Sequence, residues 1–284
     1  MRASTVASLM RLLRIGEWRG YVGLGMYGLM LASRSICTFM EYLPRLAVLV
    51  FLYMSIAYVA NNIFDVKGDT MNPKKAHKNP LTQNPSLKNQ AKAFLILLTV
   101  SAITSALLLY NNAIGQLVYL SSIVLAMFYS TPPLRFKGRP VLDLLSHSLF
   151  FGILLVLQGY YLVGKGVPEP PLLALVGVYS VFLELRNELE DYYADKLAGY
   201  NTTVVLLGLN RGLKLLSMIS IAVVSLSGML LLHKSPFLVV TAVPFLALWF
   251  ATNPRYEKYV RAIDFYVIFT LLVHLFYVVN FGST

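Results

Sequence analysis

The sequence predicts an all-α integral membrane protein with about nine membrane-spanning helices. Of its 284 residues, 57% are hydrophobic and only 13% are charged, whereas about a quarter of the residues in a soluble domain are charged. The hydrophobic residues gather in blocks that approach the roughly 20 residues a helix needs to cross a bilayer. A secreted, disulfide-rich fold is excluded because Cys37 is the only cysteine.

The apolar blocks, taken in chain order, account for the nine expected spans. The first is the weakest because Arg34 lies near its end, and the eighth is short enough to be tilted or partly interfacial. The blocks are Gly20–Met40, Leu46–Ala60, Ala93–Tyr110, Ala113–Tyr129, Val141–Val163, Pro171–Leu185, Gly212–Leu232, Pro236–Ala251 and Ala262–Asn280.

Residues 1–19 are expected to form an amphipathic helix on the membrane surface ahead of the first span. Apolar side chains recur there at close to helical spacing, between four scattered arginines. A cleavable signal peptide would need an apolar core followed by small residues, which this segment lacks. An arginine-rich transit peptide is the alternative. The apolar residues are Val6, Leu9, Met10, Leu13 and Trp18.

The net charge of +11 is distributed unevenly along the chain. Twenty of the 24 Lys and Arg residues lie before the first span or after the second, fourth, sixth and eighth. This pattern places the amino terminus and the even-numbered connections of a multi-pass cell-membrane protein in the cytoplasm. The basic charge therefore indicates topology and not nucleic-acid binding. No soluble domain interrupts residues 1–284, which we treat as a single membrane domain.

Two acidic sets share one spacing and lie 126 residues apart. Each follows an apolar block on the predicted cytoplasmic side. Residues four apart on a helix lie on the same face, so each set presents two carboxylates in one direction. The sets are Asn61-x-x-x-Asp65-x-x-x-Asp69 and Asn187-x-x-x-Asp191-x-x-x-Asp195.

This repetition indicates a metal site. One Asp-x-x-x-Asp pair is more often an ordinary solvated helix end, but two matched copies with an asparagine four residues earlier favour a function. Carboxylates that converge at a membrane edge repel one another unless cations lie among them. Hard oxygen ligands suit Mg²⁺, which keeps several waters and completes its shell with phosphate oxygens. The pattern therefore predicts magnesium that bridges the acids to a diphosphate.

Three stretches resemble the signatures of the UbiA superfamily of intramembrane prenyltransferases. The span count and the order of the loops also match, so the resemblance covers nearly the whole chain. The stretches are Asn61–Asp69 followed by Asn72-Pro73-Lys74-Lys75, Arg186–Gly199 followed by Thr202-Thr203, and the tyrosine- and basic-rich loop Tyr129–Lys137.

The resemblance implies a bundle of about nine transmembrane helices around a central cavity, capped by cytoplasmic loops. Residues 61–90 and 187–211 would be the catalytic loops. The implied reaction is Mg²⁺-dependent transfer of a prenyl group from a prenyl diphosphate to a lipophilic or aromatic acceptor in isoprenoid-lipid synthesis, with release of diphosphate. The implied partners are these substrates and membrane lipids, with no nucleic acid and no protein partner.

The resemblance also implies roles for individual residues. One Mg²⁺ ion would be bound by Asn61, Asp65 and Asp69, and a second by Asn187, Asp191 and Asp195. The two asparagines would also contact substrate, together with Lys75, Lys78, Tyr129, Arg135 and Lys137. The chain departs from the family after the first motif. Many members continue with an Arg-Pro-x-Pro-Ser-Gly-like run, whereas this chain has His77-Lys78-Asn79-Pro80-Leu81. The basic contact there is open between Lys75 and Lys78.

Other polar residues near the spans have weaker signals. Glu184 and Glu188 continue the stripe of the second acidic set. Glu188 is expected either to join the metal site or act as a base, or to pair with Arg186 or water. His147 and His274 lie within spans and are interpreted as residues that hydrogen-bond between helices.

Two other classes of membrane protein share some of these sequence features. A secondary transporter would also show internal repetition and membrane acids, but its charges usually lie near the midplane on broken helices. A CDP-alcohol phosphotransferase would need an Asp-Gly-x-x-Ala-Arg core, which the sequence lacks. The acceptor stays open among an aromatic acid, a quinone precursor, a glycerol-phosphate ether lipid, a tetrapyrrole, haem and a carotenoid.

Overall fold

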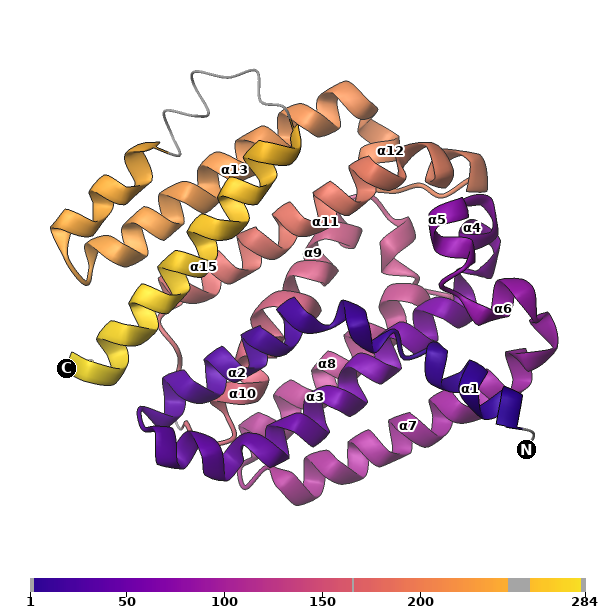
Figure 1. Cartoon of the computed structure of the whole chain (residues 1–284), viewed down its shortest axis with the longest axis horizontal. Helices are drawn as coiled ribbons and strands as arrows, with labels where there is room; N and C mark the ends of the chain where they lie inside the picture. The colour runs from indigo at the N-terminus through magenta and orange to yellow at the C-terminus, as the bar shows by residue number, and fades with distance from the viewer. Residues whose placement is uncertain (1–2, 165, 245–255, 282–284) are drawn as a thin grey trace.

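The computed structural model describes residues 3–164, 166–244 and 256–281, and all the regular elements in these ranges are helices (Figure 1). The all-α fold class is therefore confirmed. A π-helical turn, η4 (Ser148–Ile153), joins α9 to α10 into one continuous rod. The helices of the bundle, with α9 and α10 as parts of this rod, are α2 (Arg19–Ser33), α3 (Ile36–Phe64), α7 (Lys88–Leu109), α8 (Ala113–Ser130), α9 (Leu142–His147), α10 (Leu154–Tyr160), α11 (Pro170–Ala198), α13 (Leu209–Leu232) and α15 (Tyr256–Phe281).

Within these described ranges, six helical segments are long and apolar enough to cross a membrane, and each matches an expected span. The expected count of nine is not confirmed. The first expected span is α2, with 15 residues, and the sixth is α11, whose second half is charged. Within the eighth, Pro236–Ala242 forms a 3-10 helix, η5, and residues 245–251 lie outside the described ranges.

The amino-terminal segment forms two short helices instead of the single one expected, because the first ends at Arg11. They are α1 (Ala3–Arg11) and η1 (Ile15–Glu17). Leu9, Leu13 and Trp18 are buried in the hydrophobic core, whereas Val6 and Met10 are exposed. The contact of this exposed side with the membrane surface stays a prediction.

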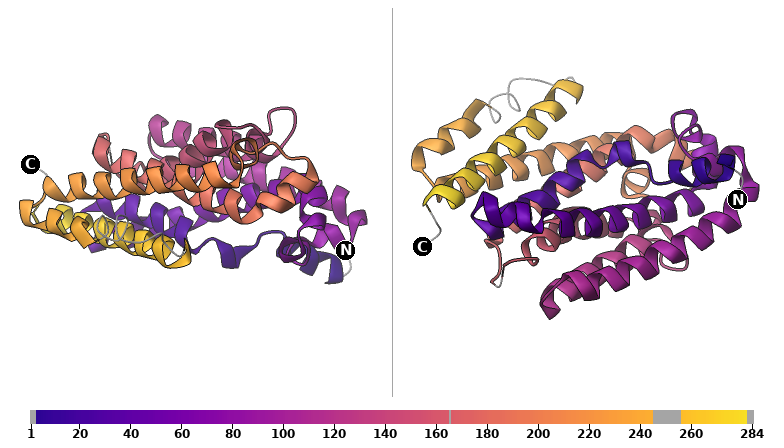
Figure 2. Two further views of the ribbon diagram at one scale, coloured as in Figure 1. Left: turned by 90° about the horizontal axis from the view of Figure 1, so that it is seen from above. Right: turned by 60° about the horizontal axis from the view of Figure 1, so that its bottom comes forward.

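Both motif loops lie at one end of the bundle. There, short helices follow α3, and one more follows α11 (Figure 1). Seen from above, the same end holds α1, and α15 ends at the opposite end (Figure 2). The spatial grouping expected for residues 61–90 and 187–211 is thus present. The short helices are α4 (Val66–Met71), α5 (Pro73–Ala76), α6 (Pro80–Gln83) and α12 (Thr203–Leu207).

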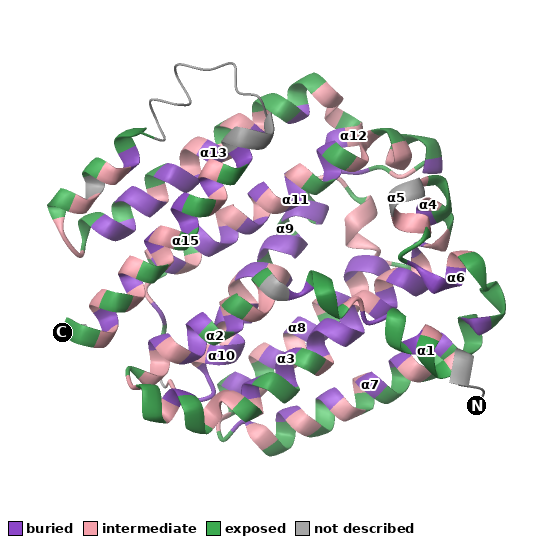
Figure 3. Ribbon diagram, in the orientation of Figure 1, coloured by how far each residue is buried: buried purple, intermediate pink, exposed green. Residues whose placement is uncertain are grey.

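Burial alternates around each long helix, with apolar side chains on the outer faces as well as in the core (Figure 3). Ile96, Leu97 and Val100 on α7 are exposed, as are Leu272 and Phe276 on α15. Apolar outer faces suit contact with lipid tails, so these helices present a hydrocarbon-compatible surface.

Helices α2 and α10 approach closely because glycines lie where they cross. A Cβ atom added to Gly28 would lie 1.9 Å from the carbonyl oxygen of Val156, and one added to Gly159 would lie 1.9 Å from that of Gly25. Small residues of this kind let helix backbones touch within a membrane. The contact fixes α2 against the wall of the bundle.

We therefore expect Gly28→Ala to lower the thermal unfolding midpoint of the detergent-solubilised protein. A methyl group facing a rigid backbone carbonyl forces the helices apart, at a cost of about 1–3 kcal/mol. The matched control is Gly23→Ala on the same helix, where a Cβ meets nothing within 4 Å. Equal midpoints for the two variants would contradict the close-packing account.

Candidate active site

A cavity of about 740 Å³ opens among the motif loops, and nine of the eleven predicted site residues line it. The other two, Asp65 and Asp69, line a small adjoining void of about 30 Å³ together with Asp195. The structure thus brings both acidic sets and the basic residues to one place. The nine are Asn61, Lys75, Lys78, Tyr129, Arg135, Lys137, Asn187, Asp191 and Asp195.

The first acidic set spans a break between two helices. Helix α3 ends at Phe64 and α4 begins at Val66, with Asp65 between them. Backbone bonds nevertheless continue through the break. The N–H of Asp65 donates to the carbonyl of Asn61 (2.9 Å), and that of Asp69 donates to the carbonyl of Asp65 (2.8 Å). The two buried carboxylates therefore stay on neighbouring turns.

The second acidic set lies on the continuous helix α11, beyond its apolar half. Asn187, Asp191 and Asp195 occupy successive turns of one face, as their spacing predicts. A side chain from the first loop joins the two sets, because Asn72 donates to Asp191 Oδ1 (3.1 Å). The loops therefore form one polar layer across the cavity mouth.

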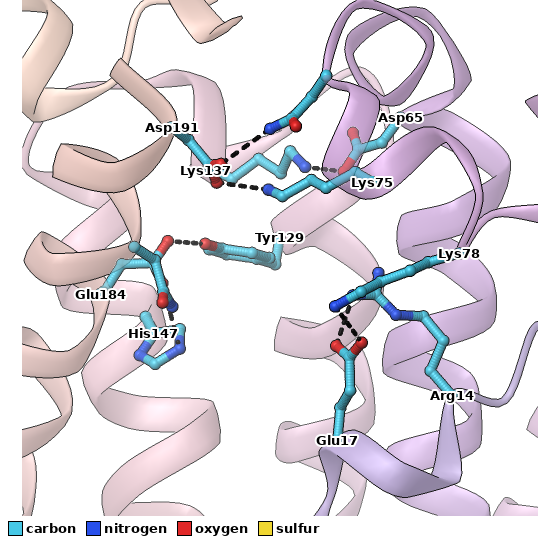
Figure 4. A network of polar contacts seen from close by, with 12 residues as sticks. Arg14, Glu17, Asp65, Lys75, Lys78, Tyr129, Lys137, His147, Glu184 and Asp191 are labelled. Atoms are coloured by element: carbon cyan, nitrogen blue, oxygen red, sulfur yellow. Dashed lines mark hydrogen bonds and ion pairs between the residues drawn. The ribbon is translucent and has the colours of Figure 1, made fainter. Parts of the chain in front are cut away.

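Cations from two loops neutralise the acids (Figure 4). Arg135 donates to Asp65 Oδ1 at 3.1 Å, and Lys137 pairs with the other oxygen of the same carboxylate. Lys75 donates to Asp191 Oδ2 at 2.5 Å. Three residues that the sequence predicted to contact substrate are thus paired with the predicted metal ligands.

Burial shifts the protonation equilibria of this polar layer. It raises the pKa of Asp69 and, with the help of the Asp191 carboxylate, raises that of Asp195 to about 6. It also lowers the pKa of Lys137 to about 8. Desolvation opposes the charged form of Lys75 as well, but the Asp191 carboxylate outweighs it and raises the pKa of that lysine. Both signs of charge are therefore held in this layer against a desolvation cost.

The acidic oxygens have the chemistry that Mg²⁺ prefers, although they are not gathered into a preformed metal cluster. Among the described residues, no three Asp, Glu, His or Cys side chains converge closely enough to hold an ion. Asp65, Asp69 and Asp195 do line the same small void. Carboxylates separated by a few ångströms suit an ion that keeps part of its water shell and bridges to phosphate. The donor set therefore fits magnesium.

Lys75 and Lys78, which the sequence left as alternatives, have different partners. Lys75 faces Asp191, whereas Lys78 donates to Glu17 (3.0 Å). Glu17 also accepts from Arg14 (2.5 Å). Of these two lysines, Lys75 thus lies within the acidic layer, and Lys78 connects the loop to the amino-terminal segment.

The family model of the UbiA prenyltransferase family matches residues 21–274. The chain belongs to this family. The resemblance inferred from the three motifs is therefore confirmed, and with it the identification as a prenyltransferase-type membrane enzyme.

Relatives and solved structures agree with this assignment. A lycopene elongase/hydratase of Halobacterium salinarum is 32% identical over 207 residues, which cover 68% of this chain and 72% of that protein. One of Haloarcula japonica is 32% identical over 175 residues, which cover 59% of this chain and only 57% of that protein.

The structural neighbours show the same fold at lower identity. A UbiA homologue from Archaeoglobus fulgidus, bound to GPP and Mg²⁺, has a TM-score of 0.71 at 19% identity and covers 96% of this chain and 99% of its own. A structure of digeranylgeranylglyceryl phosphate synthase has a TM-score of 0.70 at 18% identity, with the same coverage.

In this UbiA-family protein, Tyr200 connects three loops of the site. Its hydroxyl accepts a hydrogen bond from the N–H of Gly68 (3.0 Å), and the guanidinium carbon of Arg135 lies 4.5 Å from the centre of its ring. A Cβ on Gly68 would lie 2.5 Å from the ring. Tyr200 therefore fastens both motif loops together and positions Arg135. Its place in the sequence offered no periodic or charge signal that would have revealed this role.

Asn79, in the run that departs from the family, also has a role that the sequence analysis missed. Its amide donates to Asp69 Oδ2 (2.8 Å) and to the carbonyl of Asn62 (2.9 Å), and it is fully buried. The Asn79-Pro80 pair is a helix-start signal, and its side chain also caps α6 by accepting from the N–H of Leu81.

A second polar layer lies deeper in the cavity. The hydroxyl of Tyr129 donates to Glu184, and His147 Nε2 lies 3.4 Å from the other oxygen of that carboxylate (Figure 4). His147 Nδ1 lies 3.0 Å from Ser180 Oγ, a bond between α9 and α11 of the kind predicted for this histidine. That His147 and Glu184 line the cavity was not predicted.

Glu188 lines the cavity, but the hydrogen bond that it accepts comes from another loop and not from Arg186. It accepts a hydrogen bond from the N–H of Val204 (2.9 Å), beside Thr203, which donates twice to Asp143 at 2.6 Å. These carboxyl groups hold the start of α12 against α9 and α11. The expectation of an Arg186 partner is therefore wrong, because Arg186 instead reaches Asp264 (3.0 Å).

The ion pairs predict opposite effects of two similar substitutions on the ligand-free protein. Asp65→Asn should lower the thermal midpoint in EDTA because it removes the counter-ion of the half-buried Arg135 and Lys137, a loss of about 1–3 kcal/mol. Asp195→Asn should raise the thermal midpoint at pH 8. Folding raises the pKa of Asp195, and such a carboxyl destabilises the folded state once the pH exceeds the pKa that it has in the unfolded chain.

Thermal unfolding in detergent measures both effects. Circular dichroism of the unheated variants is the control for folding. A higher midpoint for Asp65→Asn than for Asp195→Asn would contradict the charge arrangement described above.

Proposed function

We propose that this protein transfers a prenyl group from a prenyl diphosphate to a lipophilic acceptor, with Mg²⁺, and releases diphosphate. The observation that carries the proposal is the layering of a single cavity. The second acidic set and three cations lie at its mouth beside the small void that holds Asp65 and Asp69, and aromatic rings line its depth, among them Tyr21, Phe150 and Phe151. A charged headgroup and an apolar tail fit these two parts respectively.

The two acidic sets would hold the metal ions. Asn61, Asp65 and Asp69 would bind one ion, and a second would be bound by Asn187, Asp191 and Asp195. Bound Mg²⁺ supplies the positive charge that offsets the charge developing on the leaving diphosphate. The Archaeoglobus neighbour bound to GPP and Mg²⁺ has the same fold, which supports this use of the cavity.

The cations of the site would exchange partners during binding. Arg135 and Lys137 now share Asp65, and Lys75 holds Asp191. Once metal ions neutralise the carboxylates, these cations are free to donate to diphosphate oxygens, where charge-assisted bonds are strong. Groups preorganised around the leaving group lower the barrier to breaking its bond to carbon.

The aromatic depth of the cavity would protect the reacting carbon. The C–O bond breaks with its electron pair on diphosphate, and the prenyl carbon becomes cation-like. Ring faces attract such charge, and Tyr58 and Phe151 line the cavity below the polar layer. A cavity that excludes water also prevents early capture of the cation.

The relatives favour one acceptor class among those that the sequence left open. The curated relatives at 32% identity are lycopene elongase/hydratases. We infer that the acceptor is a long polyene of the carotenoid class. The digeranylgeranylglyceryl phosphate synthase neighbour is similar at the level of fold alone. A transporter is not favoured, because the described acids of both motifs lie at one end of the bundle.

The proposed reaction should depend on metal. Membranes that contain the protein, given labelled prenyl diphosphate, a polyene and Mg²⁺, should form a prenylated polyene detectable by mass spectrometry. Excess EDTA should abolish it, and Asp191→Asn should do the same with normal membrane insertion, because the site would lose a ligand. Glu41→Gln, an exposed acid far from the motifs in sequence, is the control. Full turnover in EDTA would contradict the proposal.

The orientation of the bundle in the membrane can also be tested. We propose that the cavity opens to the cytoplasm, because the basic connections surround it. In a Cys37→Ser background, a cysteine introduced by Ser86→Cys should resist a membrane-impermeant thiol reagent added outside sealed cells. One introduced by Gly166→Cys should react. Both positions are exposed in the structure.

Permeabilised cells provide the control, since both cysteines should then react. Labelling of the Ser86 position together with protection of the Gly166 position would show that the bundle has the opposite orientation and would contradict the proposal.

A further inference from the structure

The cavity is short compared with the helices that surround it. Among the described residues of α3, Ala57 is the lining residue farthest from the mouth, and it precedes Asp65 by eight residues, which is about 12 Å along a helix. On α11 the farthest lining residue is Glu184, which precedes Asp191 by seven residues, or about 10 Å. Helix α3 itself begins at Ile36, so most of its length lies beyond the cavity.

Packed aromatic rings lie at the closed end of the cavity. On the rod formed by α9, η4 and α10, Phe151 is the described lining residue farthest from the mouth. Its ring stacks on that of Tyr21 with 4.4 Å between the ring centres, and it lies 4.2 Å from the ring of Phe150. All three residues line the cavity, and they come from α2 and η4. We call Tyr21, Phe150 and Phe151 the aromatic floor.

The space beneath the aromatic floor is filled by tyrosines whose positions are fixed. The ring of the fully buried Tyr53 lies 6.5 Å from that of Phe151, and its hydroxyl donates to the carbonyl of Phe150. Behind it, the buried Tyr119 donates to the carbonyl of Leu49 (2.7 Å). A tyrosine that moved aside would leave a buried hydroxyl and a buried carbonyl without their hydrogen bond, which is costly. The floor therefore has a firm support.

The contact between α2 and α10 closes the same end of the cavity from another side. The backbones of these helices touch at Gly25, Gly28 and Gly159, where an added Cβ atom would collide with a backbone carbonyl. Tyr21 lies one turn before Gly25 on α2, and α10 follows directly after η4. A hydrocarbon tail therefore finds no gap between these two helices once it has passed Tyr21 and Phe151.

The depth of the cavity can be compared with the length of a prenyl tail. An extended chain advances about 3.3–3.6 Å for the three main-chain bonds of a residue. An isoprene unit has four main-chain bonds and therefore spans roughly 5 Å by the same geometry. Two units match the depth of about 10–12 Å between the acidic layer and the floor. Four units would need roughly 20 Å, about twice that depth.

We propose that the donor is a short prenyl diphosphate of one or two isoprene units, and that Phe151 sets this limit. The inference rests on the proposed function and names the substrate class of the same site. With the diphosphate in the acidic layer, the tail points toward the floor and its last carbons meet the ring of Phe151. Tyr21 positions that ring by stacking on it. The small side chains of Ala57 and Ala126, which also line the cavity, leave the space that the tail occupies.

Equilibrium binding tests this limit without any acceptor. Unreactive prenyl thiodiphosphates of one, two and three isoprene units are titrated, with Mg²⁺, into the full-length protein in detergent. The wild type should bind the three-unit ligand about 10- to 200-fold more weakly than the two-unit ligand, the range over which apolar pockets discriminate by size. Phe151→Ala should remove most of this difference, because the tail can enter the space of the ring. Phe276→Ala, which removes an exposed ring on α15, is the matched control and should keep the preference.

Ala57→Leu tests the same limit in the opposite direction. A larger side chain at the deepest lining position of α3 shortens the cavity, so this variant should bind the two-unit ligand more weakly than the one-unit ligand. It keeps the inference open to contradiction where Phe151→Ala does not fold, which thermal unfolding in the same detergent reveals. A ring that only stabilised a cation during the reaction would leave the order of these binding constants unchanged.

Two results would overturn the inference. One is a wild-type protein that binds all three lengths equally, which would mean that the tail leaves the cavity by another route. The other is a length preference that stays the same in both Phe151→Ala and Ala57→Leu. A wild-type protein that binds none of the prenyl thiodiphosphates in the presence of Mg²⁺ would instead overturn the proposed function.

Discussion

The need to balance charge at the membrane edge shapes the whole site. Four carboxylates from two loops meet at one end of an apolar bundle, where an unpaired charge is expensive. In the structure, Arg135 and Lys137 balance Asp65, and Lys75 balances Asp191. Removal of the cations would leave carboxylates that are mostly buried without a partner.

The loop architecture follows from this requirement. The first set has Asp65 at a break between α3 and α4, where the loop after α8 brings Arg135 and Lys137 to its carboxylate, whereas the second set lies on the continuous helix α11. Tyr200 bridges the loops by contacting both Gly68 and Arg135. A cation whose position is fixed before substrate arrives loses less entropy when it binds a phosphate oxygen. The cap is therefore organised in advance of catalysis.

Much of this arrangement was predictable from the sequence. The spacing of the acidic sets indicated six of the eleven predicted site residues, and the family resemblance implied the other five; all eleven line two adjoining cavities. Their roles as ligands stay predictions. The number of spans could not be predicted from the length of the hydrophobic blocks. Helix α2 is shorter than its block, and α11 continues well beyond its block into a charged half.

The contacts made by single side chains were the least predictable features. Asn79 and Tyr200 act through tertiary contacts with residues from 10 to 132 positions away, which no local period reveals. His147 was interpreted as a helix–helix hydrogen-bonding residue, and it does bond Ser180. Its exposure to the cavity depends on how α9 turns into η4, a π-helical distortion without a pattern in the sequence. The presence of His147 in the deeper polar layer could therefore be seen only in the structure.

The exchange of partners at the cavity mouth is the central claim, and a structure of the protein with Mg²⁺ and an unreactive prenyl thiodiphosphate tests it most directly. The account predicts that Arg135 and Lys137 leave Asp65 and contact the diphosphate, while oxygens of Asp65 and Asp191 bind metal. Ion pairs that persist unchanged, with the diphosphate bound elsewhere, would contradict it.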